Sequence, residues 1–244
     1  MFVSVCAHAQ TVDDIINKYI DAIGGREVIS KIKSLHIESE TCVKGYKVSS
    51  DSTTTIMPNS LSSCTVDLIV GKGWKSEETD LSGLKNIQCV TDTGGWTVNW
   101  IMNLINKSSK PKTMSKDLYN FYKVNLQIGG LLMNYVENGF KAELLGKETT
   151  DSISMYKIKL TKSNSESDFY IDANTCYLIK TELGVNITPV AATITYSDYR
   201  KTDIGYAMPF RTEITMPNGG NSITTITKVV NNPEIDPKIF EQPE

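Results

Sequence analysis

From Ser34 onward, apolar residues recur at every second position, and this spacing constrains the fold more than any other feature of the chain. In the first run, Leu35, Ile37 and Val43 occupy one phase, and polar residues occupy the other, which is typical of a half-buried strand. Further short runs, separated by turn-forming residues, lie at about 47–57, 62–70, 73–79, 85–91, 140–148, 153–162, 167–172, 176–183, 190–200, 206–216 and 222–231. Such a series predicts an antiparallel meander.

A helix precedes the strands, and we predict it over 11–25. Its apolar residues recur at helical spacing, at Val12, Ile15, Ile16, Tyr19, Ile20 and Ile23. Thr11 and Asp14 stand at the spacing of a capping box, and two glycines end the pattern. A second, short helix is predicted at about 26–32.

One segment, 96–139, breaks the strand spacing. Its second part, 116–138, predicts one or two helices broken near Gly129, and these are apolar on more than one side. Such helices either complete a solid core or cover a cavity able to take an acyl chain, and the sequence leaves both alternatives open. For the second alternative we expect 98–138 to act as a lid. The expected cavity residues are Trp96, Trp100, Leu104, Phe121, Tyr122, Leu126 and Leu132.

The first ten residues, MFVSVCAHAQ, resemble the end of a signal peptide. A short apolar stretch is followed by Ala7-His8-Ala9, an A-x-A sequence of the kind that signal peptidase cleaves. We therefore predict a signal-peptide remnant at 1–9 and a single domain at 10–244. The domain is expected in the periplasm of a Gram-negative bacterium, or otherwise exported.

Cleavage after Ala9 leaves four cysteines: Cys42, Cys64, Cys89 and Cys176. In an oxidising compartment they permit three disulfide pairings. The gaps between them are wide and include no C-x-x-C, which argues against a zinc site. Cys42 and Cys64 occupy opposite strand phases. Free, partly buried thiols are therefore the favoured interpretation.

The residues available for chemistry are few. Beyond the predicted cleavage site His36 is the single histidine, which excludes sites that need two imidazoles. No G-x-S-x-G or phosphate-binding loop occurs, and no carboxylate pair is aimed at one cleft. We expect no catalysis, no metal and no cofactor; His36 and Glu77 are the residues to test if a hydrolase activity is detected.

Charge and hydropathy exclude two further classes of function. The chain of 244 residues has 25 basic and 28 acidic residues, a net charge of −3, which removes the general attraction to nucleic acid. No apolar run approaches the roughly 20 residues that span a bilayer. We expect a monomer.

Several short motifs follow one another in a recognisable order. The first half contains YIDAIGG (19–25) and DTGGW (92–96). The second half contains FKAELLGKE (140–148), MYKIKLT (155–161), DFYIDANT (168–175), LIK (178–180), SDYR (197–200), Gly205, MPF (208–210) and IDPKIF (235–240). Together they resemble the LolA-like family of outer-membrane lipoprotein-sorting and lipoprotein carrier proteins.

This resemblance implies an α+β fold: an incomplete, half-open antiparallel β-barrel of about eleven strands wrapped over a few helices, as in LolA and LolB. It also implies a hydrophobic cavity, which in studied relatives carries lipoprotein acyl chains, whereas exported Bacteroidetes-type relatives have no established ligand. The implied function is an exported carrier or binding protein for a lipid, a lipoprotein acyl chain or another apolar ligand. The alternative is a non-catalytic interaction module of the same fold, with a filled core and an envelope protein as partner.

Overall fold

The computed structural model describes residues 10–243 except 51–52, 58, 100–109, 164, 185–190 and 218. Two helices begin the described chain, α1 (Val12–Ala22) and α2 (Gly25–Ser30). The strands of the first half are β1 (Ser34–Lys44), β2 (Tyr46–Ser50), β3 (Thr53–Met57), β4 (Ser60–Ile69), β5 (Gly73–Asp80), β6 (Lys85–Thr91), β7 (Gly95–Val98) and β8 (Lys112–Thr113). Three short helices follow, α4 (Lys116–Lys123), η1 (Val124–Leu126) and α5 (Gly130–Met133). The second half contains β9 (Lys141–Thr150), β10 (Ile153–Lys162), β11 (Ser165–Asp172), β12 (Leu178–Leu183), β13 (Ala192–Lys201), β14 (Ala207–Thr215), β15 (Asn221–Asn231) and the final turn η2 (Pro237–Phe240).

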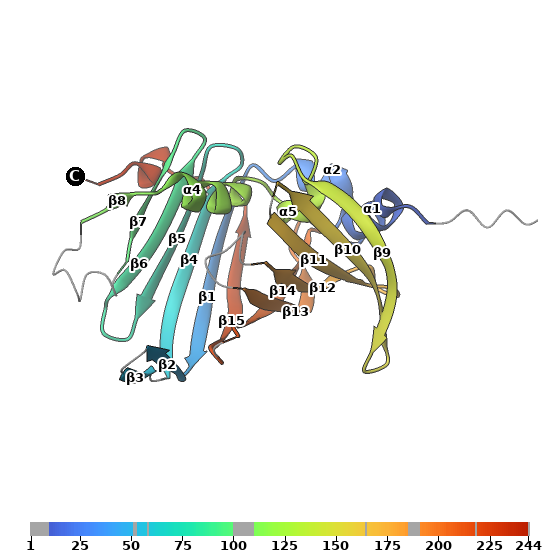
Figure 1. Ribbon diagram of the computed structural model, residues 1–244. Coiled ribbons are helices and arrows are strands. Elements are labelled where there is room, and N and C mark those ends of the chain that lie inside the picture. Colours follow the sequence, from blue (N-terminus) through green and yellow to red (C-terminus); the bar gives the residue numbers. More distant parts are fainter. Residues whose placement is uncertain are drawn as a thin grey trace, which may run out of the picture.

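The strands form one 13-stranded antiparallel sheet, in the order β8-β7-β6-β5-β4-β1-β15-β14-β13-β12-β11-β10-β9. It consists of two meanders joined at the centre, where the first strand pairs with the last. The sheet is curved and remains open, with β8 at one edge and β9 at the other (Figure 1). The helices lie across one end of the strands (Figure 1). The predicted half-open antiparallel fold is confirmed.

The structure differs from the sequence-based expectation in three places. The single strand expected at 47–57 is a hairpin of β2 and β3, which forms a separate two-stranded sheet. The segment expected to break the strand pattern from 96 onward begins with β7, which pairs with β6. The short edge strand β8 then pairs with β7. Strands of two and four residues are too short for their alternation to be recognised in the sequence.

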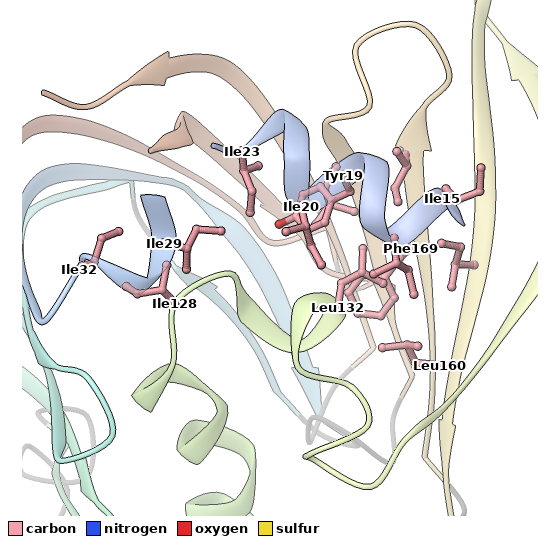
Figure 2. Packing of buried hydrophobic residues seen from close by; sticks show 14 of the residues in the cluster. Ile15, Tyr19, Ile20, Ile23, Ile29, Ile32, Ile128, Leu132, Leu160 and Phe169 are labelled. Atoms are coloured by element: carbon pink, nitrogen blue, oxygen red, sulfur yellow. The ribbon is translucent and has the colours of Figure 1, made fainter. Parts of the chain in front are cut away.

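The largest cluster of buried side chains lies between the helices and the sheet. Helix α1 starts with the predicted capping box, in which Thr11 and Asp14 bond each other's backbone N–H. Its apolar side faces Leu132 on α5 and Leu160 and Phe169 on the sheet (Figure 2). Leu132 is 1% exposed, and Leu160 is fully buried. Buried side chains from α1, α5 and the sheet therefore pack together in the space beneath α1.

A second cluster fixes the C-terminal turn to the other side of the sheet. Phe240 of η2 packs against Trp96 and Cys89, and the Trp96 Nε1–H donates a hydrogen bond of 2.9 Å to the Phe240 carbonyl oxygen. Gly73 allows the close approach, since a Cβ atom at this position would lie 2.5 Å from the Phe240 ring. The Asp236 side chain caps the turn by accepting from the Lys238 N–H.

Buried hydroxyl and thiol groups change the acid–base chemistry of these clusters. Burial raises the pKa of the Cys89 thiol to about 12 and that of the Tyr206 hydroxyl to about 12. Burial also raises the pKa values of Tyr19 and Tyr196. These groups therefore keep their protons in the folded protein at pH values where the unfolded chain loses them.

We predict that Phe240→Ala lowers the free energy of unfolding by about 3–5 kcal/mol, because it removes a buried aromatic ring from a packed cluster. Urea denaturation followed by circular dichroism measures the change. The control is Leu81→Ala, at a position that is 84% exposed, which should change stability by less than about 0.5 kcal/mol. Equal effects of the two substitutions would contradict the anchoring role of η2.

We also predict that stability falls in alkaline solution. The folded pKa values of Cys89 and Tyr206 are raised, so their contribution is complete below the ordinary values of 9.0 and 10.0 and is lost as pH rises toward 12. Each group contributes a slope of up to about 1.4 kcal/mol per pH unit. Urea denaturation at a series of pH values measures the slope. Cys89→Ala should make it shallower, whereas Cys42→Ala, at an exposed thiol, should not; a flat profile above pH 9 would refute the prediction.

Candidate functional site

Strand register divides the sheet into two faces. Side chains alternate along each strand, and directly paired residues on neighbouring strands point to the same side. Leu35, Leu68 and Trp74 are paired across β1, β4 and β5 and pack beneath the helices. We call this side the inner face and the opposite side the outer face.

Helix α4 covers the inner face at the β5–β6 side. Tyr122 stacks on Trp74 with ring centroids 5.7 Å apart, and Phe121 meets Tyr122 edge to face at 4.9 Å. Leu126 is buried in the same cluster with Val90. The structure thus brings together three of the residues predicted to line a cavity: Phe121, Tyr122 and Leu126.

The other predicted cavity residues lie elsewhere. Leu132 belongs to the cluster beneath α1. Val90 of β6 is paired with Trp74 and therefore points to the inner face, so its neighbour Cys89 points to the outer face. Trp96 is paired with Cys89. Trp96 therefore also points to the outer face, where it packs against η2. Trp100 and Leu104 lie outside the described residues. Because the strand β7 was not predicted, the sequence alone did not indicate the direction of Trp96.

Beyond the helices, the inner face continues as a surface of half-buried apolar side chains. Its members are Val43, Val66, Ile194, Ile214 and Ile226. None of them belongs to the clusters packed beneath the helices or η2. These five residues come from five strands, on both sides of the β1–β15 pair, and we call them the uncovered inner face.

A row of hydroxyl-bearing residues crosses the inner face, from its uncovered part to Tyr196, which packs against the cluster beneath the helices. Register pairs each member with the next across β4, β1, β15, β14 and β13, in the order Ser62, Thr41, Thr224, Thr212 and Tyr196. The Oγ1 atoms of Thr41 and Thr224 are 2.9 Å apart. Ser62 Oγ donates a hydrogen bond of 2.5 Å to Oε1 of Glu78 on β5. Sequence reasoning did not find this row, because its members come together only through long-range pairing.

The outer face carries ion pairs. Glu77 bonds both Lys75 and Lys85, at 2.9 and 2.5 Å, and Lys228 bonds Glu38 at 2.7 Å. His36 Nδ1 lies 2.7 Å from Asp67 Oδ1 on the same face. Both residues named for a hydrolase test, His36 and Glu77, are therefore engaged in charged contacts on the outer face.

Three further observations limit the chemistry of the described part of the chain. Its four cysteines, Cys42, Cys64, Cys89 and Cys176, are free. No group of three or more His, Cys, Asp or Glu side chains that could hold a metal ion occurs within it. None of its helices has the length and apolar character needed to cross a membrane.

Two shallow hollows, of about 320 and 230 Å³, are lined by residues of β10 to β14 and the loops beside them. Glu182 and Leu183 line both of them, and neither is lined by a helix residue. These hollows therefore lie away from the residues that the sequence suggested for a covered cavity.

No protein-family model and no curated protein sequence matches this chain. Solved structures do match it along nearly the whole length. A LolA superfamily protein from Nitrosomonas europaea is 15% identical, with a TM-score of 0.59 over 96% of this chain and 98% of its own. A domain assigned to outer membrane lipoprotein sorting, from Vibrio parahaemolyticus, is 11% identical, with a TM-score of 0.56 over 94% and 95%.

A DUF1329 family protein from Desulfovibrio piger is 10% identical to this chain, with a TM-score of 0.54 over 96% of this chain and 98% of its own. At these identities the likeness concerns the fold, and it agrees with the open antiparallel sheet and its few helices. The resemblance predicted from the short motifs is confirmed at this level: the chain has a LolA-like fold.

Proposed function

We propose that this protein is an exported, non-enzymatic carrier or binding protein that holds the acyl chain of a lipid or lipoprotein against the uncovered inner face. The observation that carries the proposal is the surface formed by Val66, Ile194, Ile214 and their neighbours, which is apolar, half-buried and separate from the packed clusters. The LolA-like fold supports it, since one similar structure is assigned to lipoprotein sorting.

The proposed site differs from a cavity beneath the helices. Side chains fill the region under α1, where Ile158, Leu160 and Ile171 are fully buried. An apolar chain lying along the uncovered inner face would meet side chains from both meanders. Each methylene removed from water there contributes about 0.8 kcal/mol before the cost of immobilising the ligand.

Helix α4 and the following turn η1 would border this site at the β5–β6 side, through Tyr122 of α4 and Leu126 of η1. Residues 10–244 would act as one domain and as a monomer. Export to the periplasm, or otherwise out of the cytoplasm, is proposed from the A-x-A sequence that ends at Ala9.

We predict that Ile214→Ser weakens binding of a neutral fluorescent acyl probe about tenfold, because it removes an apolar side chain from the uncovered inner face. The matched control is Ile223→Ser on the neighbouring strand. Ile223 is paired with Glu213 and Cys42 and points to the outer face, so its substitution should leave probe affinity unchanged. Fluorescence titration measures both affinities, and equal losses in the two variants would refute the proposed surface.

The solid packing beneath α1 favours one alternative, a non-catalytic interaction module that binds an envelope protein. Native mass spectrometry of protein purified from its host separates the two functions. A co-purifying lipid supports the carrier. Absence of lipid, together with failure to bind the acyl probe, would overturn the carrier and leave the interaction module.

A further inference from the structure

We propose that the ligand is an amphiphile with an ammonium-bearing polar group, which Glu78 binds at the border of the uncovered inner face. This inference rests on the proposed function and specifies its ligand class. Glu78 lies on β5, paired with Cys64 on one side and Asn86 on the other. Register therefore directs its carboxylate to the inner face, one row from the hydroxyl row.

Within the described part of the chain, no ion pair neutralises this carboxylate. Glu77, the preceding residue, bonds two lysines on the outer face. Among the described residues no Lys or Arg forms an ion pair with Glu78. Lys112, paired with Thr97, shares the inner face but is exposed on β8, three strands away, or about 14 Å at ordinary strand spacing.

Asp80, the other acidic residue of β5 on this face, uses one carboxylate oxygen to hold the turn to β6. Its Oδ1 accepts hydrogen bonds from the backbone N–H groups of Ser82 and Leu84 and from the Ser82 hydroxyl, within the turn to β6. The described contacts of Glu78 are different: one donor, the Ser62 hydroxyl, bonds its Oε1 atom. An ionised carboxylate offers about four acceptor positions, so Glu78 retains capacity for a ligand donor.

The surroundings strengthen an ion pair at this position. Glu78 is half-buried, and its partner Ser62 is 6% exposed. Next to it, burial raises the pKa of the Cys64 thiol, and the negative charge of Glu78 raises it further. The Glu78 carboxylate is therefore partly shielded from water. In such surroundings its charge interaction with an ammonium group is stronger than it would be in water.

Polar and apolar contacts adjoin at this point. Ser76 and Gln88 are paired with each other on the same face, and Ser76 is also paired with Val66 of the uncovered inner face. A chain resting on Val66 would thus bring its polar end toward Glu78 and the hydroxyl groups around it. An anionic end would instead meet the Glu78 carboxylate and be disfavoured.

Three amphiphiles with the same chain test the proposal: dodecylammonium, dodecanol and dodecyl sulfate, each below its micelle concentration. Displacement of a neutral fluorescent acyl probe measures their affinities. We expect dodecylammonium to bind about tenfold more tightly than dodecanol, and dodecyl sulfate more weakly than either. The preference should decrease as salt is added, because ions screen the charge interaction.

Glu78→Gln is expected to reduce dodecylammonium affinity about tenfold and to leave dodecanol affinity unchanged. Glu77→Gln, which removes the adjacent carboxylate from the outer face, is the matched control and should alter neither affinity. Dodecanol binding in each variant also shows that the sheet is intact. Equal binding of the three amphiphiles, or an unchanged preference in Glu78→Gln, would overturn the ammonium assignment and leave the carrier standing. Failure of all three to displace the probe would overturn both.

Discussion

The pairing of the first strand with the last is the interaction on which the other features depend. β1 and β15 are registered along ten positions, from the Leu35–Asn231 pair to the Lys44–Asn221 pair, with one bulge after Glu38. This contact joins two meanders that would otherwise be separate sheets. It also makes their inner faces continuous, so that Thr41 of the first meander meets Thr224 of the second. The uncovered inner face exists only because this register is held.

Local pattern was sufficient for much of the fold. Period-two alternation predicted the long strands, and the capping box at Thr11 and Asp14 predicted the start of α1. The failures were local as well. β7 and β8 are too short to alternate recognisably, and the run at 47–57 was predicted as one strand although residues 49–52, SSDS, favour a turn. The errors therefore concern two short strands and one missed reversal of the chain.

The candidate site was less accessible to sequence reasoning than the fold. Large apolar residues in 96–139 suggested a cavity, but Tyr122 and Leu126 pack against Trp74 and Val90, while Trp96 faces the other side of the sheet. The features that define the proposed site are branched apolar side chains, a row of hydroxyl groups and one glutamate. Their relation is set by register between residues such as Ser62, Thr41 and Thr224, and a single sequence carries no direct signal of register between distant strands.

An open sheet has edges, and the two edges here are kept from pairing in different ways. β8 has only two residues, too few to hold a further strand. β9 is long, but its pairing with β10 shifts register near Gly146, and it carries lysine and glutamate residues along its exposed length, namely Lys141, Glu143, Lys147 and Glu148. A bulge and alternating charges oppose the addition of a strand from a second copy. The sheet can therefore stay curved and open, with its inner face accessible. Its edges do not serve as templates on which further copies of the protein would add strands.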